Sequence, residues 1–143
     1  MARKLTRGQF LKKSGTTALG LAAGGALLQG CDPIEYADAE KTRPPGAPAS
    51  FLAKTEDVQT SYYVAKGKLK AILIRTGKTI RGYVNTCSHE EAALYFAKGV
   101  LYCPVHGSHF DPVTGEARKK PATKPLTAIK LKVEKGLVLL VKA

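Results

Sequence analysis

Cys87-Ser88-His89 and Cys103-Pro104-Val105-His106 are the two stretches that decide how this sequence folds. Each stretch combines a thiol with an imidazole, and the 13 residues 90–102 separate them. Two cysteines and two histidines form a metal-ligand set, and this order and spacing are uncommon by chance. We therefore expect a metal centre, and an electron carrier rather than a hydrolase or a binding module.

The counts of cysteine and histidine support a single metal centre. The three cysteines are Cys31, Cys87 and Cys103, which are too few for a disulfide framework or for a cluster held by four thiolates. The third histidine, His109, follows His106 by three residues. We expect His109 at the surface, with a role toward a partner or a proton as the alternative.

Residues 1–30 have the pattern of an export signal. Basic residues near the N-terminus precede an uncharged stretch, 14–30, that is rich in Ala, Leu and Gly. Its glycines weaken a stable membrane span, which needs about 20 strongly apolar residues. Residues 6–12, Thr-Arg-Gly-Gln-Phe-Leu-Lys, resemble a twin-arginine export signal in which Gly8 replaces the second arginine.

The end of this segment, Leu28-Gln29-Gly30-Cys31, resembles a bacterial lipobox. The resemblance implies that Cys31 is lipidated and becomes the first residue of the mature protein. We therefore expect a lipid-anchored protein on the periplasmic side of the cytoplasmic membrane. The alternative is an uncleaved N-terminal membrane anchor in which Cys31 is incidental.

Residues 31–50 are predicted to be a Pro-rich linker behind the lipid anchor. The run 43–48, Arg-Pro-Pro-Gly-Ala-Pro, cannot sustain a helix or a central strand. Two interpretations remain open for this segment. It is either an extended tether or a tail that packs on the domain surface.

Residues 51–143 are predicted to form one small all-β domain. Period-two alternation and short turns containing glycine predict antiparallel strands arranged as a sandwich or barrel. The predicted strands are 61–65, 69–76, 79–86, 94–96, 100–102, 129–134 and 137–141. A hairpin over 94–102 would return the chain, so that both Cys-His stretches lie at one tip.

The two stretches, continued by residues 107–111, Gly-Ser-His-Phe-Asp, resemble the Rieske [2Fe–2S] family. The resemblance covers about residues 55–143 and implies a small antiparallel β-sandwich with a cluster-binding subdomain formed by two loops. It implies that Cys87 and Cys103 bind one iron of a [2Fe–2S] cluster, and that His89 and His106 bind the other. Residues 121–125 would form the loop that covers the cluster.

Replacement of two thiolates by imidazoles explains the redox range of such centres. With neutral imidazoles the oxidised site has no net charge, whereas four thiolates would give it two negative charges. An added electron therefore costs less, and Rieske centres have potentials of about −150 to +300 mV. Each imidazole also keeps a second nitrogen that can carry a proton.

Several residues depart from the pattern of the quinol-oxidising members of the family. Those members carry a disulfide between the loops and a tyrosine hydroxyl near a ligand sulfur; the corresponding positions are Ala92 and Val105, and Phe110. Ser108 retains a hydroxyl that can donate a hydrogen bond to a cluster sulfur. Fewer such bonds predict a potential below the top of the range, as in a Rieske ferredoxin.

Three hypotheses for function follow. The first is an exported one-electron carrier between a membrane donor and a redox protein such as a cytochrome. The second is the electron-transfer subunit of a larger exported oxidoreductase or quinol-oxidising complex, and the third is a structural zinc domain.

Catalysis by the chain alone is not indicated, because no nucleophile motif or acid/base pair is evident. The net charge of +12 comes from scattered basic residues, so we expect no nucleic-acid binding.

Overall fold

Antiparallel strands make up most of the regular structure in residues 33–141, which are the residues that this computed structural model describes. The predicted all-β fold class is confirmed. The predicted export signal and the predicted lipid-attachment residue, Cys31, lie outside the described residues. Within residues 33–141, no helix has the length and apolar character needed to cross a membrane.

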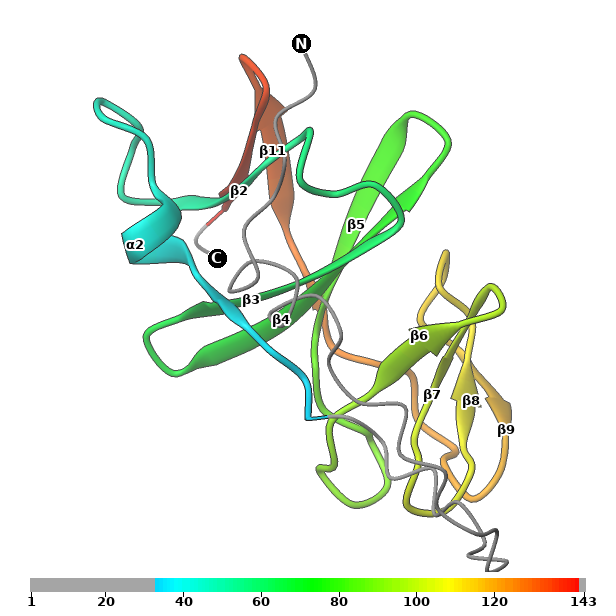
Figure 1. The fold of residues 1–143 in the computed structure, drawn as a ribbon. Coiled ribbons are helices and arrows are strands. Elements are labelled where there is room, and N and C mark those ends of the chain that lie inside the picture. Colours follow the sequence, from blue (N-terminus) through cyan, green and yellow to red (C-terminus); the bar gives the residue numbers. More distant parts are fainter. Residues whose placement is uncertain (1–32, 142–143) are drawn as a thin grey trace, which may run out of the picture. The chain divides into compact units, whose positions relative to one another are not determined.

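The largest sheet has five strands in the order β1-β3-β4-β5-β10 (Figure 1). Its bounds are Ala37–Asp38 for β1, Ser61–Lys66 for β3, Leu69–Thr76 for β4, Thr79–Val84 for β5 and Ala128–Ile129 for β10. Strands β3, β4 and β5 form a meander joined by two tight turns. Strand β1 pairs with β3 in parallel, whereas the other neighbours are antiparallel.

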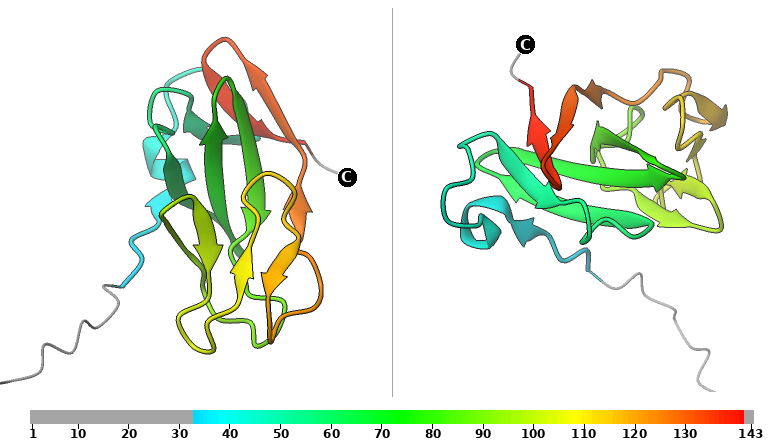
Figure 2. Two further views of the ribbon diagram at one scale, coloured as in Figure 1. Left: turned by 90° about the vertical axis from the view of Figure 1, so that its right-hand side faces the viewer. Right: turned by 90° about the horizontal axis from the view of Figure 1, so that it is seen from above.

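Two smaller sheets complete the domain (Figure 2). One has the order β11-β12-β2, and the other has the order β6-β7-β8-β9. Their bounds are Phe51–Lys54 for β2, Tyr95–Ala97 for β6, Val100–Tyr102 for β7, His109–Phe110 for β8, Ala117–Lys119 for β9, Leu131–Glu134 for β11 and Leu137–Leu140 for β12. The four-stranded sheet is the subdomain that carries both Cys-His stretches at its loops.

Strand β4 is the structural centre because both of its faces are buried. Ala71 and Leu73 face one core, which also contains residues of β2 and β12, whereas Ile72 and Ile74 face the other. This explains why residues 71–74 form a continuous apolar run rather than an alternating one. The first core joins the five-stranded sheet to the three-stranded sheet, and the second joins the five-stranded sheet to the Cys-His subdomain.

The second core contains the two cysteines of the motif. Cys87 and Cys103 are each 1 % exposed and pack in this core with other fully buried side chains. The main apolar members around them are Leu94, Leu101 and Phe110. Packing of the β-meander against the subdomain therefore places both thiols in a site that excludes water.

The segment that precedes β2 packs on the domain. Strand β1 pairs with β3, and the short helix α2, Ala39–Thr42, follows it with Asp38 as its N-cap. Ala39 is fully buried in the first core, and the hydroxyl of Tyr36 accepts a hydrogen bond from Asn85 Nδ2 at 2.7 Å. Residues 36–42 therefore pack on the domain surface. Helix α2 was not predicted.

The predicted hairpins agree with the observed pairing. Residues 69–76 pair with 79–84, 95–97 pair with 100–102, and 131–134 pair with 137–140. Strands β1, β2, β8 and β9 were not predicted, nor was the break between β10 and β11. The hairpin β6–β7 returns the chain as expected and brings the two Cys-His loops to the same end of the subdomain.

Candidate metal centre

The first loop of the site, residues 85–94, follows β5 and is closed by its own backbone. The amide of Cys87 donates to the carbonyl of Ala92 at 2.7 Å, and the amide of Glu91 donates to the carbonyl of Cys87 at 3.0 Å. Asn85 fixes the far end, since its Oδ1 accepts from the amide of Leu94 at 3.0 Å. These bonds turn the Cys87 side chain inward and leave His89 and Glu90 at the tip.

The second loop, residues 103–108, follows β7 and is closed in a similar way. The amide of Cys103 donates to the carbonyl of Ser108 at 2.8 Å, and the amide of Gly107 donates to the carbonyl of Cys103 at 2.9 Å. Gly107 has a φ of 71°, a conformation that glycine adopts without steric cost. Cys103 is therefore turned into the core, while His106 remains exposed.

A third loop, residues 120–126, contacts both of the others. The hydroxyl of Ser108 accepts a hydrogen bond from the amide of Ala122 at 3.0 Å, and the hydroxyl of Ser88 donates to the carbonyl of Lys124 at 2.7 Å. Ser108 is fully buried. Because its oxygen accepts from Ala122, its own proton remains available for donation toward the site, as the predicted role of Ser108 requires.

The two cysteines are adjacent and neither forms a disulfide. Burial raises the pKa of the Cys103 thiol, and the neighbouring Cys87 thiol raises it further. The backbone amides of Val105 and His106 act in the opposite direction, because they donate hydrogen bonds to the Cys103 sulfur. Amides directed at a buried sulfur stabilise a thiolate, which is the form that binds a metal.

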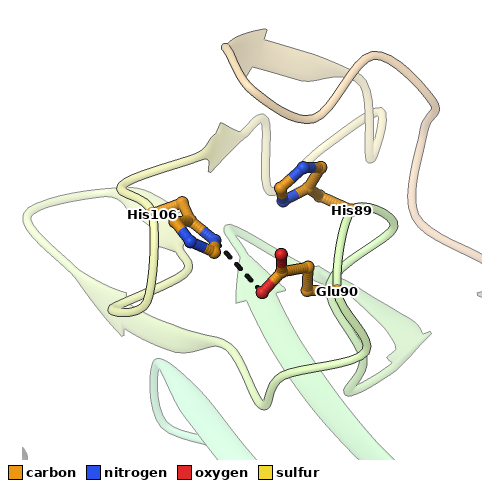
Figure 3. A group of neighbouring side chains, drawn as sticks. All are labelled: His89, Glu90 and His106. Carbon is orange, nitrogen blue, oxygen red and sulfur yellow. Dashed lines mark ion pairs between the residues drawn. The ribbon is translucent and has the colours of Figure 1, made fainter.

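The two histidines form the exposed edge of the site. The rings of His89 and His106 meet edge to face, with centroids 5.2 Å apart and planes at 84°. Glu90 lies beside them, and its Oε2 is 3.3 Å from His106 Nδ1 (Figure 3). One ligand atom from each of these three residues lies within 4.8 Å of the others.

The structure thus brings together all four residues that the motif singled out. Two buried soft sulfur donors lie on the inner side, and two exposed nitrogen donors lie on the outer side. This donor set fits a [2Fe–2S] cluster with one iron held by thiolates and the other by imidazoles. The sequence analysis missed Glu90, since a glutamate in an exposed loop carries no signal that distinguishes it from solvated carboxylates.

Ala92, Val105 and Phe110 are the positions where the disulfide and the tyrosine hydroxyl of quinol-oxidising members are expected to be absent. Ala92 is half-buried and packs against the second core, whereas Val105 is 54 % exposed at the tip of the second loop. Phe110 is fully buried in the core that holds Cys87 and Cys103. His109 is half-buried in β8 opposite Tyr102, so the expectation that it points simply to solvent is only partly met.

Asp111 fixes the turn between β8 and β9. Its Oδ1 accepts from the amides of Val113 and Thr114 at 2.8 and 2.9 Å, and its Oδ2 contacts Arg118 Nη2 at 2.8 Å. The amide of Thr114, the Arg118 guanidinium and the amide of Val113 lower the pKa of Asp111 from 3.8 to about 2. The folded protein therefore favours the ionised carboxylate.

Replacement of Asp111 by asparagine is expected to lower stability in a pH-dependent way. The folded-state pKa is depressed, so the contribution is present above pH 3.8 and is lost as the pH falls toward about 2. After allowance for solvent screening around Arg118, we expect a loss of about 1 kcal/mol near neutral pH. Urea unfolding of Asp111→Asn and the unmodified protein at pH 6, 4 and 3 should show a difference that shrinks with acidity. A constant difference would contradict the assigned cause.

Comparisons with known proteins agree with this geometry. The family model for the Rieske [2Fe–2S] domain matches residues 49–132. The Sphingomonas yanoikuyae B1 ferredoxin is 23 % identical, with a TM-score of 0.58 over 65 % of this chain and 97 % of that chain. The plasma membrane Rieske protein from Synechocystis PCC 6803 is 20 % identical, with a TM-score of 0.58 over 64 % and 98 %.

A further solved structure, a complex of reduced oxygenase and oxidized ferredoxin in carbazole 1,9a-dioxygenase, contains a chain that is 27 % identical. It has a TM-score of 0.56 and covers 63 % of this chain and 89 % of that chain. No curated protein sequence matches the chain. The family match covers more than half of the sequence and includes both Cys-His loops, and the chain therefore belongs to the Rieske [2Fe–2S] family.

Proposed function

We propose that this protein is a one-electron carrier in which Cys87 and Cys103 bind one iron of the [2Fe–2S] cluster and His89 and His106 bind the other. The observation that carries the proposal is the pairing of two buried thiols with two exposed imidazoles in edge-to-face contact. When bound, the cluster supplies reversible one-electron chemistry.

The residues around the site have distinct tasks in this proposal. Leu94, Leu101 and Phe110 exclude water from the sulfur side, which keeps the site rigid and its local dielectric low. The amides of Val105 and His106 stabilise negative charge on the Cys103 sulfur. The imidazoles remain at the surface, so that a partner can approach within a short distance of the metal.

The experiment that tests this function is spectroscopy of the purified full chain. We expect a coloured protein with stoichiometric iron and sulfide, and a reduced-state EPR signal with the low average g value of a Cys/His-ligated [2Fe–2S] centre. Film voltammetry should show one reversible electron, with a potential below the top of the Rieske range. A colourless protein that contains zinc would overturn the proposal and support the structural zinc alternative.

Substitution of Phe110 by tyrosine is expected to raise the reduction potential. Phe110 shares the second core with Cys87 and Cys103 and occupies the position where the quinol-oxidising members of the family carry a tyrosine hydroxyl near a ligand sulfur. A hydroxyl there would donate toward that sulfur and favour the reduced state. A bond that is stronger by about 1 kcal/mol in the reduced state corresponds to roughly 40 mV for one electron. Film voltammetry measures the shift. Phe96→Tyr, the same chemical change at a half-buried position of β6, should leave the potential unchanged.

The cellular setting is part of the same proposal. The signal-like residues 1–30 and the lipobox-like Cys31 support export and a lipid anchor on the periplasmic side of the cytoplasmic membrane. Mass analysis of the protein extracted from membranes tests this: we expect an N-terminus at Cys31 that carries acyl chains. An intact Met1 without lipid would contradict the lipoprotein and leave the uncleaved anchor.

A subunit of a larger exported oxidoreductase is the second candidate. Val105 is a 54 % exposed apolar side chain at the tip of the second loop, where a permanent partner could bury it. Gel filtration of the natively expressed protein in mild detergent separates the two candidates. A carrier elutes alone at the mass of one chain, whereas a subunit elutes with its redox partners.

A further inference from the structure

The end of β9 and the loop that covers the site carry a group of lysines that none of the roles above uses. Lys119, Lys120 and Lys124 are all exposed, and in the described part of the chain no ion pair involves any of them. Their neighbour Arg118 differs, because its guanidinium is paired with Asp111 at 2.8 Å. The three lysines therefore contribute uncompensated positive charge.

Two contacts place this charge beside the histidine edge. A Cβ built on Gly107 would lie 3.9 Å from Lys119 Nζ, so that ammonium group lies beside the loop that holds His106. The carbonyl of Lys124 accepts a hydrogen bond from the hydroxyl of Ser88 at 2.7 Å, so the backbone of Lys124 lies beside the loop that holds His89. In the sequence, Lys120 lies between Lys119 and Lys124, the two residues that make these contacts.

The tip of the first Cys-His loop carries charge of the opposite sign. Glu90 contacts His106, and Glu91 is exposed on the same loop. The imidazole edge is therefore bordered by segments of opposite charge, one with three lysines and one with two glutamates. A charge distribution of this kind both attracts a partner and fixes its orientation.

We propose that Lys119, Lys120 and Lys124 form a docking surface for a redox partner that presents carboxylates beside its own redox centre. The inference rests on the proposed electron-transfer function and specifies which partner the exposed edge accepts. Carboxylates against the three ammonium groups, with basic or neutral groups facing Glu90 and Glu91, would bring the partner's centre over His89 and His106. One electron then passes from the reduced cluster to the partner, and no bond forms or breaks.

The experiment uses the cluster-loaded full chain and cytochrome c in two forms. Succinylation converts the lysines of this basic protein to carboxylates, so the two forms present opposite charge to the same chain. Stopped-flow mixing follows the reduction of ferric haem by the reduced cluster, which is oxidised by one electron. An ionic strength of about 0.1 M limits electrostatic range to roughly 10 Å, so that local charge is measured rather than net charge.

A charge-reversed variant and a matched control test the location. The test variant is Lys119→Glu, Lys120→Glu and Lys124→Glu. The control is Lys78→Glu, Lys98→Glu and Lys135→Glu, which changes the net charge by the same amount. These lysines lie in the turns β4–β5, β6–β7 and β11–β12, at strand ends away from the Cys-His loops. We expect the test variant to react about tenfold more slowly with succinylated cytochrome c, and the control to react at nearly the original rate.

A second readout is independent of electron transfer. Carbodiimide links carboxylates to lysine amines, and peptide mass mapping should find succinylated cytochrome c joined to Lys119, Lys120 or Lys124 rather than to the control lysines. The EPR signal of every variant reports whether the cluster is present. Absence of the signal in the unmodified protein would defeat the proposed function itself.

Several results would overturn the docking surface while leaving the cluster intact. One is an equal loss of rate in the test and control variants, and another is a faster reaction with unmodified cytochrome c. A third is that the test variant loses binding to vesicles of phosphatidylcholine and phosphatidylglycerol in equal parts while its electron-transfer rate is unchanged. That result would assign the three lysines to a lipid surface.

Discussion

Replacement of Cys103 by serine is expected to abolish the cluster, with loss of visible colour, bound iron and the reduced-state EPR signal. The serine hydroxyl deprotonates far less readily than a thiol, so it is a poor ligand at neutral pH. The amides of Val105 and His106, which donate to the Cys103 sulfur, would then face a neutral oxygen. Because metal binding stabilises a small domain, we also expect a lower unfolding midpoint.

Two further variants separate ligand loss from misfolding. Serine at a position that is 1 % exposed carries a desolvation cost of about 1–3 kcal/mol, so Cys103→Ser alone could lose the cluster by unfolding. Cys103→Ala avoids that cost and should retain the far-UV circular dichroism of the fold without the cluster. Val105→Ser changes the same loop at an exposed position and should keep both. Retention of a full EPR signal by Cys103→Ala would refute the assignment of Cys103 as a ligand.

The sequence predicted the strands whose patterns are local. The three hairpins have alternating or apolar strands joined by turns that contain glycine, and their pairing matches the prediction. Strand β8 has only two residues, and β9 reads Ala-Arg-Lys, which is too short and too polar to show a period of two. Strand β2 follows a Pro-rich run that obscured its start. The packing of Ala39 depends on a tertiary contact that no local pattern encodes.

In the candidate site, too, the features encoded locally were predicted and the tertiary contacts were not. The spacing of the Cys-His stretches, together with the predicted hairpin, placed Cys87, His89, Cys103 and His106 at one tip, and the structure brings them together there. Contacts between loops could not be predicted, since the amide of Ala122 reaches Ser108 across 14 residues. The contact of Ser88 with Lys124 spans 36 residues. Such bonds depend on the packed tertiary arrangement, and the contact of Ser88 with Lys124 is one of the two that place the lysines beside the Cys-His loops.

Replacement of Gly115 by alanine is expected to produce the largest loss of stability among substitutions outside the predicted ligands. Gly115 is buried and has a φ of +77°, and a Cβ there would lie 2.7 Å from Cε1 of Tyr83. Tyr83 cannot easily move, because it is 2 % exposed and its hydroxyl donates to the carbonyl of Pro112 at 3.2 Å. The backbone strain costs about 1–2 kcal/mol, and overpacking costs roughly a further 1–3 kcal/mol.

Gly99 provides a matched control for this substitution. It also has a φ of +77°, yet a Cβ there would meet nothing within 4 Å. Gly99→Ala therefore incurs the backbone cost without the collision, and the difference between the two variants isolates the contact with Tyr83. Thermal unfolding should give a midpoint that is lower for Gly115→Ala by on the order of 10 °C. Equal midpoints for the two variants would mean that Tyr83 relaxes without cost.

The same substitution should also weaken retention of the cluster. The carbonyl of Gly115 accepts a hydrogen bond from the amide of Leu126 at 2.8 Å, which fixes the end of the loop that reaches Ser108 and Ser88. A displaced Gly115 would loosen that loop and expose the sulfur side of the site to water. We therefore expect the visible signal of the cluster to decay faster in Gly115→Ala than in Gly99→Ala at temperatures where both variants remain folded. Equal decay rates would show that the covering loop does not depend on this turn.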